Sequence, residues 1–377
     1  MSTNPDFRPY RRLSFLPERN AFYRWWVGLA GSVKFQRFAS SNLLTRGTAK
    51  RDGEKLFDLV AGFVHSQVLS AFVQLDLADV LKDEPLPAWK IAARIGLEVR
   101  QTEVLCQAAT ALGLMTRRAE GTYALGRLGA ALPGVPGLAQ MIAHHEVLYR
   151  DLEDPIKFFK AEGETELAKF WPYVFGTQGA NDPEVAETYS KLMSDSQGLV
   201  AEETLRSLSL RGITKLMDVG GGTGAFLRAV AAQNPDLDLT LFDLPTVVAK
   251  ADVPDTTRIV PGSFREDALP DDVDAISLVR VLYDHSDTTV TGLLRKVYTA
   301  LPPGGRLIVS EPMAGGDHPT RAGDAYFAIY TLAMQTGKAR SVQEVSDHLD
   351  QAGFQNVIHV RTHRPFVTSV VTATKPY

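Results

Sequence analysis

Residues 218–224 read Asp-Val-Gly-Gly-Gly-Thr-Gly and close a short apolar run that begins at residue 215. Glycines between a strand and a helix let the backbone approach a ligand closely, with free amides facing it. Further strand patterns lie at residues 237–242, 258–260, 273–279, 306–310, 356–362 and 368–374, and helical patterns at 225–233, 288–300 and 341–352. This alternation predicts a doubly wound, largely parallel, Rossmann-like α/β sheet.

The acidic residues around the glycines bear on the choice of ligand. A glycine-rich loop alone is equally typical of dinucleotide-binding proteins. Asp218 stands two residues before the first glycine, where a carboxylate repels a pyrophosphate but attracts a cationic ammonium and sulfonium. Asp243 ends the second strand, where a carboxylate can hold two ribose hydroxyls of either ligand. The pattern favours S-adenosylmethionine, and the candidate cofactor-binding residues are Asp218, Gly220, Gly222, Gly224, Asp243, Leu244, Ser263, Phe264 and Arg280.

The N-terminal half has a different pattern. Residues 55–132 predict a helix, a turn, a second helix over 100–112 and a hairpin that turns at Glu120-Gly121, which is a winged-helix arrangement. The second helix has one basic residue, Arg100, so packing or dimerisation is favoured over DNA binding. Residues 138–210 look helical throughout. We therefore expect an arm (1–54), an all-helical winged-helix dimerisation domain (55–135), a substrate-lining helical segment (136–210) and the cofactor domain (211–377).

The charge of the chain is unevenly distributed. Residues 1–55 hold eleven basic and four acidic residues, a net +7, which leaves −11 for the remainder of a chain whose total is −4. The same arm holds the large aromatic residues Phe22, Tyr23, Trp25, Trp26, Phe35 and Phe38. This mixture suits a helix on an anionic membrane surface; packing on the body or on a partner subunit is the alternative, and nucleic-acid binding is disfavoured by the acidic remainder. We expect a cytoplasmic protein, peripheral at most at the inner membrane.

Two further features limit the class of protein. The apolar stretch at residues 56–73 is interrupted by Asp58, His65 and Gln67, and we expect it not to span a bilayer. The single cysteine, Cys106, lies in an apolar run and is expected to be a buried, inert thiol. No histidine or carboxylate cluster stands beside the glycine loop, so no metal site is expected.

At these residues the chain resembles the plant-type small-molecule O-methyltransferases. The shared stretches are residues 218–224, the Phe-Asp-Leu-Pro at 242–245 and Glu311-Pro312, and the resemblance runs from about Lys55 to the C-terminus. Within the family, residues 56–64, 170–173, 280–285 and 334–337 resemble most the bacterial hydroxyneurosporene and demethylspheroidene O-methyltransferases of carotenoid biosynthesis. The resemblance implies an intertwined homodimer and a methyl ether formed on a hydrophobic, hydroxylated acyclic carotenoid.

The chain departs from the family at three positions. Tyr283 stands where the family has its catalytic histidine, Ala339 where it has a glutamate, and Ser263 where an aspartate usually contacts adenine. The flanking Glu311 is retained. The histidine-based mechanism of the plant enzymes is therefore not carried over.

A tertiary alcohol is about as weak an acid as water, with a pKa near ~15.7, so its proton must leave late, as the C–O bond forms. We expect Tyr283 to hydrogen-bond the acceptor hydroxyl, with Asp284 or His285 taking the proton and Glu311 assisting. His144 or His145 could instead be the base; adjacent helical residues point about 100° apart, so we expect at most one to face the site. The candidate substrate-binding residues are His144, His145, Tyr189, Met193, Arg321 and Asp324.

Three alternatives remain open. The same fold could methylate a phenolic, polyketide or tetrapyrrole acceptor, it could be a ligand-sensing winged-helix regulator, or it could be a dehydrogenase.

Overall fold

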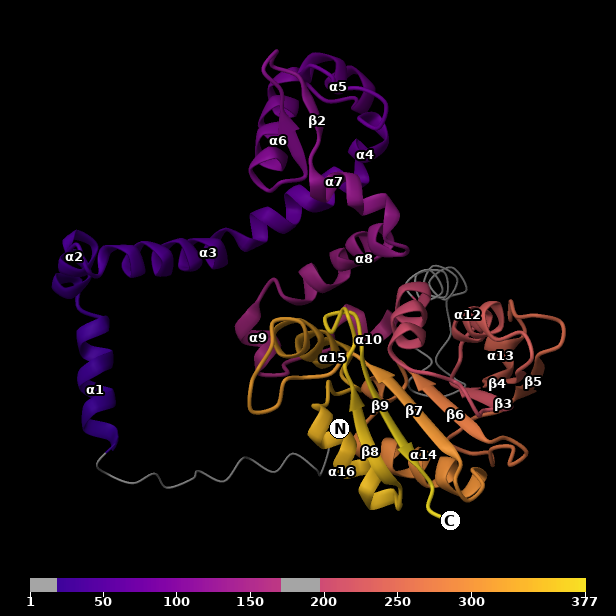
Figure 1. Cartoon of the computed structure of the whole chain (residues 1–377). Helices are drawn as coiled ribbons and strands as arrows, with labels where there is room; N and C mark the ends of the chain where they lie inside the picture. Colours follow the sequence, from indigo (N-terminus) through magenta and orange to yellow (C-terminus); the bar gives the residue numbers. More distant parts are fainter. Residues whose placement is uncertain (1–18, 171–196) are drawn as a thin grey trace. The chain divides into compact units, whose positions relative to one another are not determined.

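The computed structural model describes residues 19–170 and 197–377 (Figure 1). The glycine loop follows an inner strand of a seven-stranded sheet. The strand order is β5-β4-β3-β6-β7-β9-β8. The neighbouring pairs from β5 to β7 are parallel, and β9 is antiparallel to both β7 and β8. The bounds are β3 (Lys215–Val219), β4 (Asp238–Asp243), β5 (Arg258–Pro261), β6 (Ala275–Val279), β7 (Arg306–Glu311), β8 (Gln355–Val360) and β9 (Ser369–Thr374). The prediction of a doubly wound, largely parallel sheet is confirmed.

Alternate residues of the strands pack into two separate hydrophobic cores, one on each face of the sheet. On β3, Met217 and Val219 pack toward one face, whereas Leu216 packs toward the other. The first face is covered by α14 (Asp287–Ala300) and α16 (Val342–Ala352); the second is covered by helical residues 197–207, by α12 (Ala225–Gln233) and by α13 (Pro245–Val248). Because both faces are buried, the central strands read as continuous apolar runs.

The order of the strands creates a crevice. The chain moves outward from β3 through β4 to β5 and then returns to place β6 on the other side of β3. Ligands bind outside the carboxyl ends of the strands at such a switch point. The loops after β3, β4, β5, β6 and β7 all open on this edge, and they carry most of the candidate residues.

The winged-helix prediction is confirmed, but the description "all-helical" is wrong because the wing is a two-stranded hairpin. The elements are α4 (Leu77–Val80), α5 (Ala88–Ile95), α6 (Val99–Ala111), β1 (Met115–Arg117), β2 (Tyr123–Leu125), α7 (Arg127–Ala131) and η1 (Leu132–Gly134). Cys106 on α6 is fully buried, and burial raises the pKa of its thiol to about 11, as expected for an inert thiol. Next come α8 (Leu138–Asp151), α9 (Pro155–Phe159) and α10 (Glu166–Phe170), then η3 (Leu282–Asp284), the π-helical turn η4 (Gly323–Phe327) and α15 (Ala328–Met334).

The N-terminal unit, residues 1–68, separates from residues 69–377 by its internal contacts. It contains α1 (Arg19–Ala30), α2 (Val33–Ser41) and most of α3 (Arg46–Gln74), which crosses the expected domain boundary at residues 54 and 55. An 18-residue window of α3 has a mean hydropathy of 1.6, so by length and composition this helix could cross a membrane. Length and composition alone therefore do not support the expectation that this segment does not span a bilayer. Only 11% of the window is buried.

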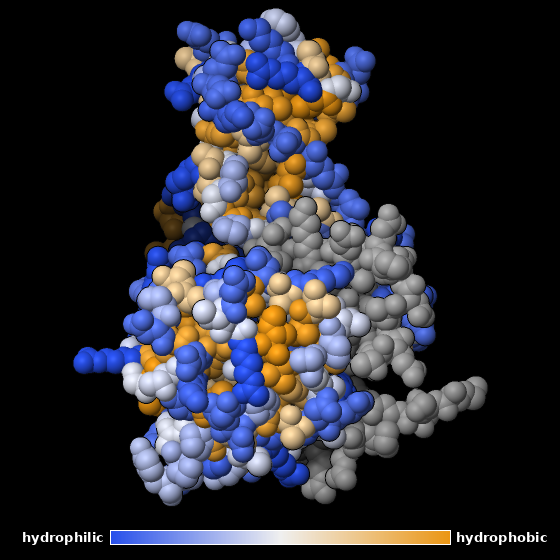
Figure 2. All heavy atoms as spheres, turned by 90° about the vertical axis from the view of Figure 1, so that its right-hand side faces the viewer, coloured by the Kyte–Doolittle hydropathy of each residue, from blue (hydrophilic) through white to orange (hydrophobic). Residues whose placement is uncertain are grey.

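The rest of the described surface is mixed. On the face shown in Figure 2, hydrophilic side chains predominate and hydrophobic ones show between them in patches. Scattered apolar side chains are ordinary on a protein surface. Exposed large apolar side chains are concentrated on α1 to α3.

Candidate functional site

Three glycines of the loop after β3 have a backbone conformation that other residues rarely adopt. The φ angles of Gly220, Gly222 and Gly224 are 72°, 61° and 91°. A Cβ atom at Gly220 would lie 2.8 Å from Val281 Cγ2, and one at Gly221 would lie 2.5 Å from Asp218 Oδ2. The backbone of the loop therefore passes directly over Asp218 and leaves no room for a side chain at Gly221.

Asp218 is buried below this loop. Its Oδ1 accepts a hydrogen bond of 2.6 Å from Ser277 Oγ on β6, across the switch point. Its Oδ2 is buried and has no hydrogen-bond partner within residues 19–170 and 197–377. Burial raises the pKa of Asp218 to about 7, opposed by the Ser277 hydrogen bond and reinforced by nearby Asp243. A buried carboxylate oxygen without a donor fits the ammonium group of a bound ligand.

Asp243 holds the second half of the loop. Its Oδ2 accepts from the backbone N–H of Gly222 at 2.7 Å, and its Oδ1 accepts from that of Leu244 at 2.6 Å. Burial raises the pKa of Asp243 to about 6, although these two amides lower it. Each carboxylate oxygen has a second lone pair, so this side chain can hold the loop and still accept from two hydroxyls.

The loop after β5 supplies a second wall. Ser263 donates its backbone N–H to Asp267 Oδ2 at 2.8 Å, and the half-buried Phe264 ring lies 5.2 Å from the His285 ring, edge to face. His285 Nδ1 lies 3.2 Å from Nη2 of Arg265. Burial lowers the pKa of His285 to about 3, helped by Arg265 and Arg340. The contacts of His285 are thus with the predicted cofactor-binding loop.

The segment after β6 forms the other side of the site. Arg280 has a left-handed φ of 57° and donates from Nη2 to the Tyr283 hydroxyl at 3.1 Å, with its guanidinium 5.5 Å from the centre of the ring. Burial raises the pKa of Tyr283 and of Asp284. Asp284 Oδ1 is buried without a hydrogen-bond partner in the described parts of the chain. Arg280, a candidate for the cofactor, therefore has its side chain against Tyr283.

Glu311 positions this segment. Its Oε1 accepts the backbone N–H groups of Val281 at 2.9 Å and Leu282 at 2.7 Å, so the carboxylate at the end of β7 fixes the start of η3. Its Oε2 is buried and has no partner within the described residues. Burial raises the pKa of Glu311 to about 7 against the pull of these amides.

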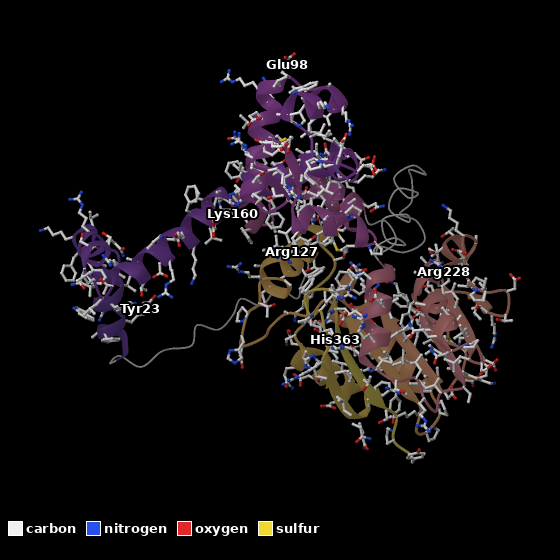
Figure 3. The ribbon with its side chains drawn as sticks, turned by 45° about the horizontal axis from the view of Figure 1, so that its top comes forward. Tyr23, Glu98, Arg127, Lys160, Arg228 and His363 are labelled. Atoms are coloured by element: carbon white, nitrogen blue, oxygen red, sulfur yellow. The ribbon has the colours of Figure 1, made fainter. Side chains whose placement is uncertain are left out.

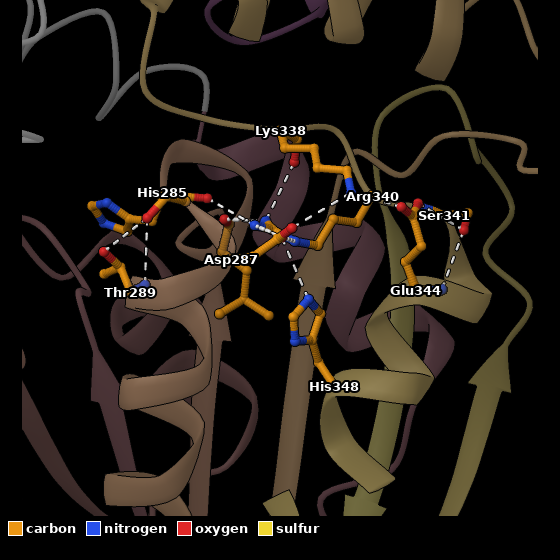
Figure 4. Close-up of polar contacts among 10 residues, drawn as sticks. His285, Asp287, Thr289, Lys338, Arg340, Ser341, Glu344 and His348 are labelled. Carbon is orange, nitrogen blue, oxygen red and sulfur yellow. Dashed lines mark hydrogen bonds and ion pairs between the residues drawn. The ribbon is translucent and has the colours of Figure 1, made fainter. Parts of the chain in front are cut away.

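Arg340 holds the same segment from the other side (Figure 4). It is buried and donates to the backbone carbonyls of Leu282 at 2.7 Å and His285 at 2.9 Å, as well as to Asp287 at 2.6 Å. Sequence reasoning missed this residue as a site element. An arginine does persist at position 340, directly after Ala339 in the altered family segment, and that was the available signal.

Both candidate histidines of α8 reach tyrosines of one facing segment. His144 Nε2 lies 2.8 Å from the Tyr330 hydroxyl, and His145 Nε2 lies 2.6 Å from the Tyr326 hydroxyl. The two rings diverge, and both meet this segment because its tyrosines come from successive turns. Sequence reasoning missed both tyrosines. Their spacing of four residues on an otherwise apolar helix was the only signal.

The remaining candidates are dispersed. Asp324 Oδ2 accepts the backbone N–H groups of Gly315 at 2.8 Å and Thr320 at 2.7 Å, so it shapes the loop before η4. Arg321 is exposed. Tyr189 and Met193 lie outside the described residues.

The fold and this site together define an S-adenosylmethionine-dependent methyltransferase: the strand order, the glycine loop over an unsatisfied carboxylate and the second acid on β4 occur here in one crevice. Residues 149–355 match the sequence model of the O-methyltransferase domain, and residues 57–135 match that of the O-methyltransferase dimerisation domain. The chain belongs to this O-methyltransferase family.

Individual relatives agree with this assignment. The chain is 51% identical to a demethylspheroidene O-methyltransferase of Cereibacter sphaeroides over 94% of this chain and 95% of the relative. It is 53% identical to the protein of the same name from Rhodobacter capsulatus, over 90% and 85%. Human N-acetylserotonin methyltransferase shares the fold, with a TM-score of 0.75 at 23% identity over 86% of this chain and 98% of that chain.

The raised pKa of Asp218 predicts a pH dependence of cofactor affinity. Below about pH 7 the empty site holds a proton that a cation must displace, so affinity should rise with pH. We expect the dissociation constant of S-adenosylmethionine to be more than about tenfold higher at pH 5.5 than at pH 7.5. Calorimetric titration in two buffers of different ionisation enthalpy should also show proton release at the lower pH. A flat profile, or one that Asp218→Asn does not flatten, would contradict this account.

Proposed function

We propose that this protein transfers a methyl group from S-adenosylmethionine to the hydroxyl of a hydrophobic acyclic hydroxycarotenoid of the hydroxyneurosporene or demethylspheroidene type. The observation that carries the proposal is the identity of 51% and 53% to two proteins of that named activity along almost the whole chain. The replacement of the family histidine by Tyr283 also fits an acceptor that is not a readily ionised phenol.

The cofactor supplies an activated methyl group: an oxygen lone pair of the acceptor forms the C–O bond as the C–S bond breaks, and the sulfonium becomes a neutral thioether. Asp218 would hold its ammonium group, Asp243 its ribose, and Leu244 and Phe264 its adenine. Tyr283 orients the acceptor hydroxyl, because Arg280 fixes its phenol and Glu311 fixes its backbone segment. Positioning of this kind can account for a large part of the rate.

The test is to express the protein in a host that makes hydroxylated acyclic carotenoids and to analyse the extracted pigments by mass spectrometry. A gain of one methylene unit, absent with Asp243→Ala, supports the proposal. Methylation of a phenol, a polyketide or a tetrapyrrole by the purified protein, with none of the carotenoid, would replace the acceptor but keep the reaction.

We further propose a homodimer, in which a second copy covers the apolar side of α3. Leu56, Phe57, Leu59, Val60 and Phe63 are exposed there, and the matched dimerisation domain begins at residue 57. In this proposal the dimer contact uses α3, so α1 and α2 are available to contact the membrane that holds the substrate.

On α1, the side chains Phe22, Tyr23, Trp25 and Trp26 are all more than half exposed (Figure 3 labels Tyr23). Aromatic side chains beside a net positive charge are typical of helices that lie on anionic bilayers. We propose that this arm attaches the protein to the membrane surface, in the cytoplasm.

The arm proposal predicts a loss of lipid binding when its tryptophans are replaced. Trp25→Ser with Trp26→Ser should lower co-sedimentation with phosphatidylglycerol vesicles about tenfold or more, because each buried indole contributes roughly 1 kcal/mol or more. Trp89→Ser is the matched control, since this tryptophan is equally exposed, at 59%, but lies on α5. Equal losses in both variants, or none in either, would mean that the arm packs on protein.

A further inference from the structure

Two tyrosine–histidine pairs lie between α8 and the segment from η4 to α15. His144 and Tyr330 form one pair at 2.8 Å, and both side chains are buried. His145 and Tyr326 form the second pair at 2.6 Å, and these side chains are half-buried. A buried imidazole hydrogen-bonded to a phenol can either lock two helices together or pass a proton between them.

The two pairs have different surroundings. α15 packs against η3, and the groups that act electrostatically on Tyr330 are Tyr283, Tyr326, Arg280 and Asp284. Those that act on Tyr326 are Arg280 and Tyr149. Of the two phenols, Tyr330 is therefore the one that interacts electrostatically with Tyr283, which orients the acceptor in the proposed function.

The other candidate bases are held in other roles. Glu311 accepts two backbone amides, and His285 contacts Phe264 and Arg265 on the cofactor side. Tyr283 accepts a hydrogen bond from Arg280. Asp284 interacts electrostatically with Arg280 and Glu311, and burial raises its pKa. His144 Nε2 lies 2.8 Å from the hydroxyl of Tyr330, whose helix α15 packs against η3.

We infer that Tyr330 and His144 together accept the proton of the acceptor hydroxyl, an inference that rests on the proposed function. As the acceptor oxygen forms its bond to carbon, its proton passes to the oxygen of Tyr330, and the proton of Tyr330 passes to Nε2 of His144. Tyr330 ends neutral and His144 ends as an imidazolium. The relay requires that the resting His144 carry its proton on Nδ1.

The change of charge at the methyl donor favours this route. Burial lowers the pKa of His144 to about 4, helped by His145, so the resting imidazole is neutral. The same burial opposes the imidazolium, but the donor loses one positive charge during the reaction, and the imidazolium restores it at the moment it forms. A proton that remained on the acceptor oxygen would instead leave an oxonium ion, which is a far stronger acid than an imidazolium.

The His145–Tyr326 pair provides matched controls. We expect Tyr330→Phe and His144→Gln to lower kcat about 100-fold, the lower end for general acid–base catalysis, with the acceptor KM and the dissociation constant of S-adenosylhomocysteine within threefold of wild type. Tyr326→Phe and His145→Gln remove the neighbouring pair and should cost much less in kcat. Equal losses in the two pairs, accompanied by equal falls in melting temperature, would reduce both pairs to helix packing and overturn the relay.

A second readout does not depend on turnover. In protein labelled with ¹⁵N-histidine, the ring resonances lost in His144→Gln identify His144, and their shifts should report the Nδ1–H tautomer at pH 7. An Nε2–H tautomer makes His144 the donor to Tyr330 and overturns the relay. Failure of the proposed function is a separate result: the wild type would then methylate no carotenoid, while the tautomer and the ratio between the two pairs could still be measured with whichever acceptor reacts.

Discussion

Asp243→Ala is expected to weaken the binding of S-adenosylmethionine about 1000-fold. The carboxylate joins the backbone N–H groups of Gly222 and Leu244, and under the proposed function it also holds the ribose. Hydrogen bonds to a charged group contribute about 2 kcal/mol each, and the loss of two toward the ligand corresponds to roughly three orders of magnitude in affinity. Calorimetric titration with S-adenosylmethionine and S-adenosylhomocysteine measures the change.

The control for this variant lies on the same strand. Asp238 begins β4 and is exposed, so Asp238→Ala removes an identical carboxylate from the opposite end of the strand. Its affinity should match the wild type. Circular dichroism should match the wild type in both variants. The melting temperature should be unchanged in Asp238→Ala and should fall in Asp243→Ala, because the amides of Gly222 and Leu244 lose their acceptor. If Asp243→Ala binds within tenfold of wild type while remaining folded, the ribose is not held here.

Glu311→Ala is expected to lower kcat about 1000-fold. It leaves the amides of Val281 and Leu282 buried without their acceptor, at a cost of roughly 1–3 kcal/mol each. The segment that carries Tyr283 would then leave its productive position, and about 4 kcal/mol in the barrier corresponds to three orders of magnitude in rate. The melting temperature should fall as well.

Glu311→Gln separates positioning from charge. Its amide oxygen can still accept both backbone N–H groups, so we expect it to recover most of the activity that alanine loses. Because the carboxylate holds η3 and not the glycine loop, the dissociation constant of S-adenosylhomocysteine should stay within threefold of wild type in both variants. If glutamine is as inactive as alanine, the ionised carboxylate itself acts in the reaction and the positioning role is wrong.

The cofactor half of the site was readable from the sequence because its determinants are local. The glycine loop, Asp218 and Asp243 lie at the ends of β3 and β4, two strands that follow each other in the sequence and pair in the sheet. Gly220, Gly222 and Gly224 adopt positive φ angles, which glycine can do because it has no Cβ atom. The hairpin of the winged helix and the buried Cys106 were equally local features.

The acceptor half depended on contacts between distant segments. Tyr326 and Tyr330 meet their histidines across more than 180 residues of sequence, and Arg340 meets His285 across 55. Helical periodicity could place His144 and His145 on diverging faces, but it could not say that two successive turns of another helix receive both.

The amino-acid sequence by itself thus determined the fold class, the family and the candidate carboxylates for a positively charged nucleoside. It could do so because strand periodicity and glycine conformation are properties of short segments. Only the tertiary structure decided that the His285 ring contacts Phe264 and Arg265, that Glu311 and Arg340 hold η3, and that Tyr330 meets His144. Those roles follow from packing, which brings together side chains that no local pattern relates.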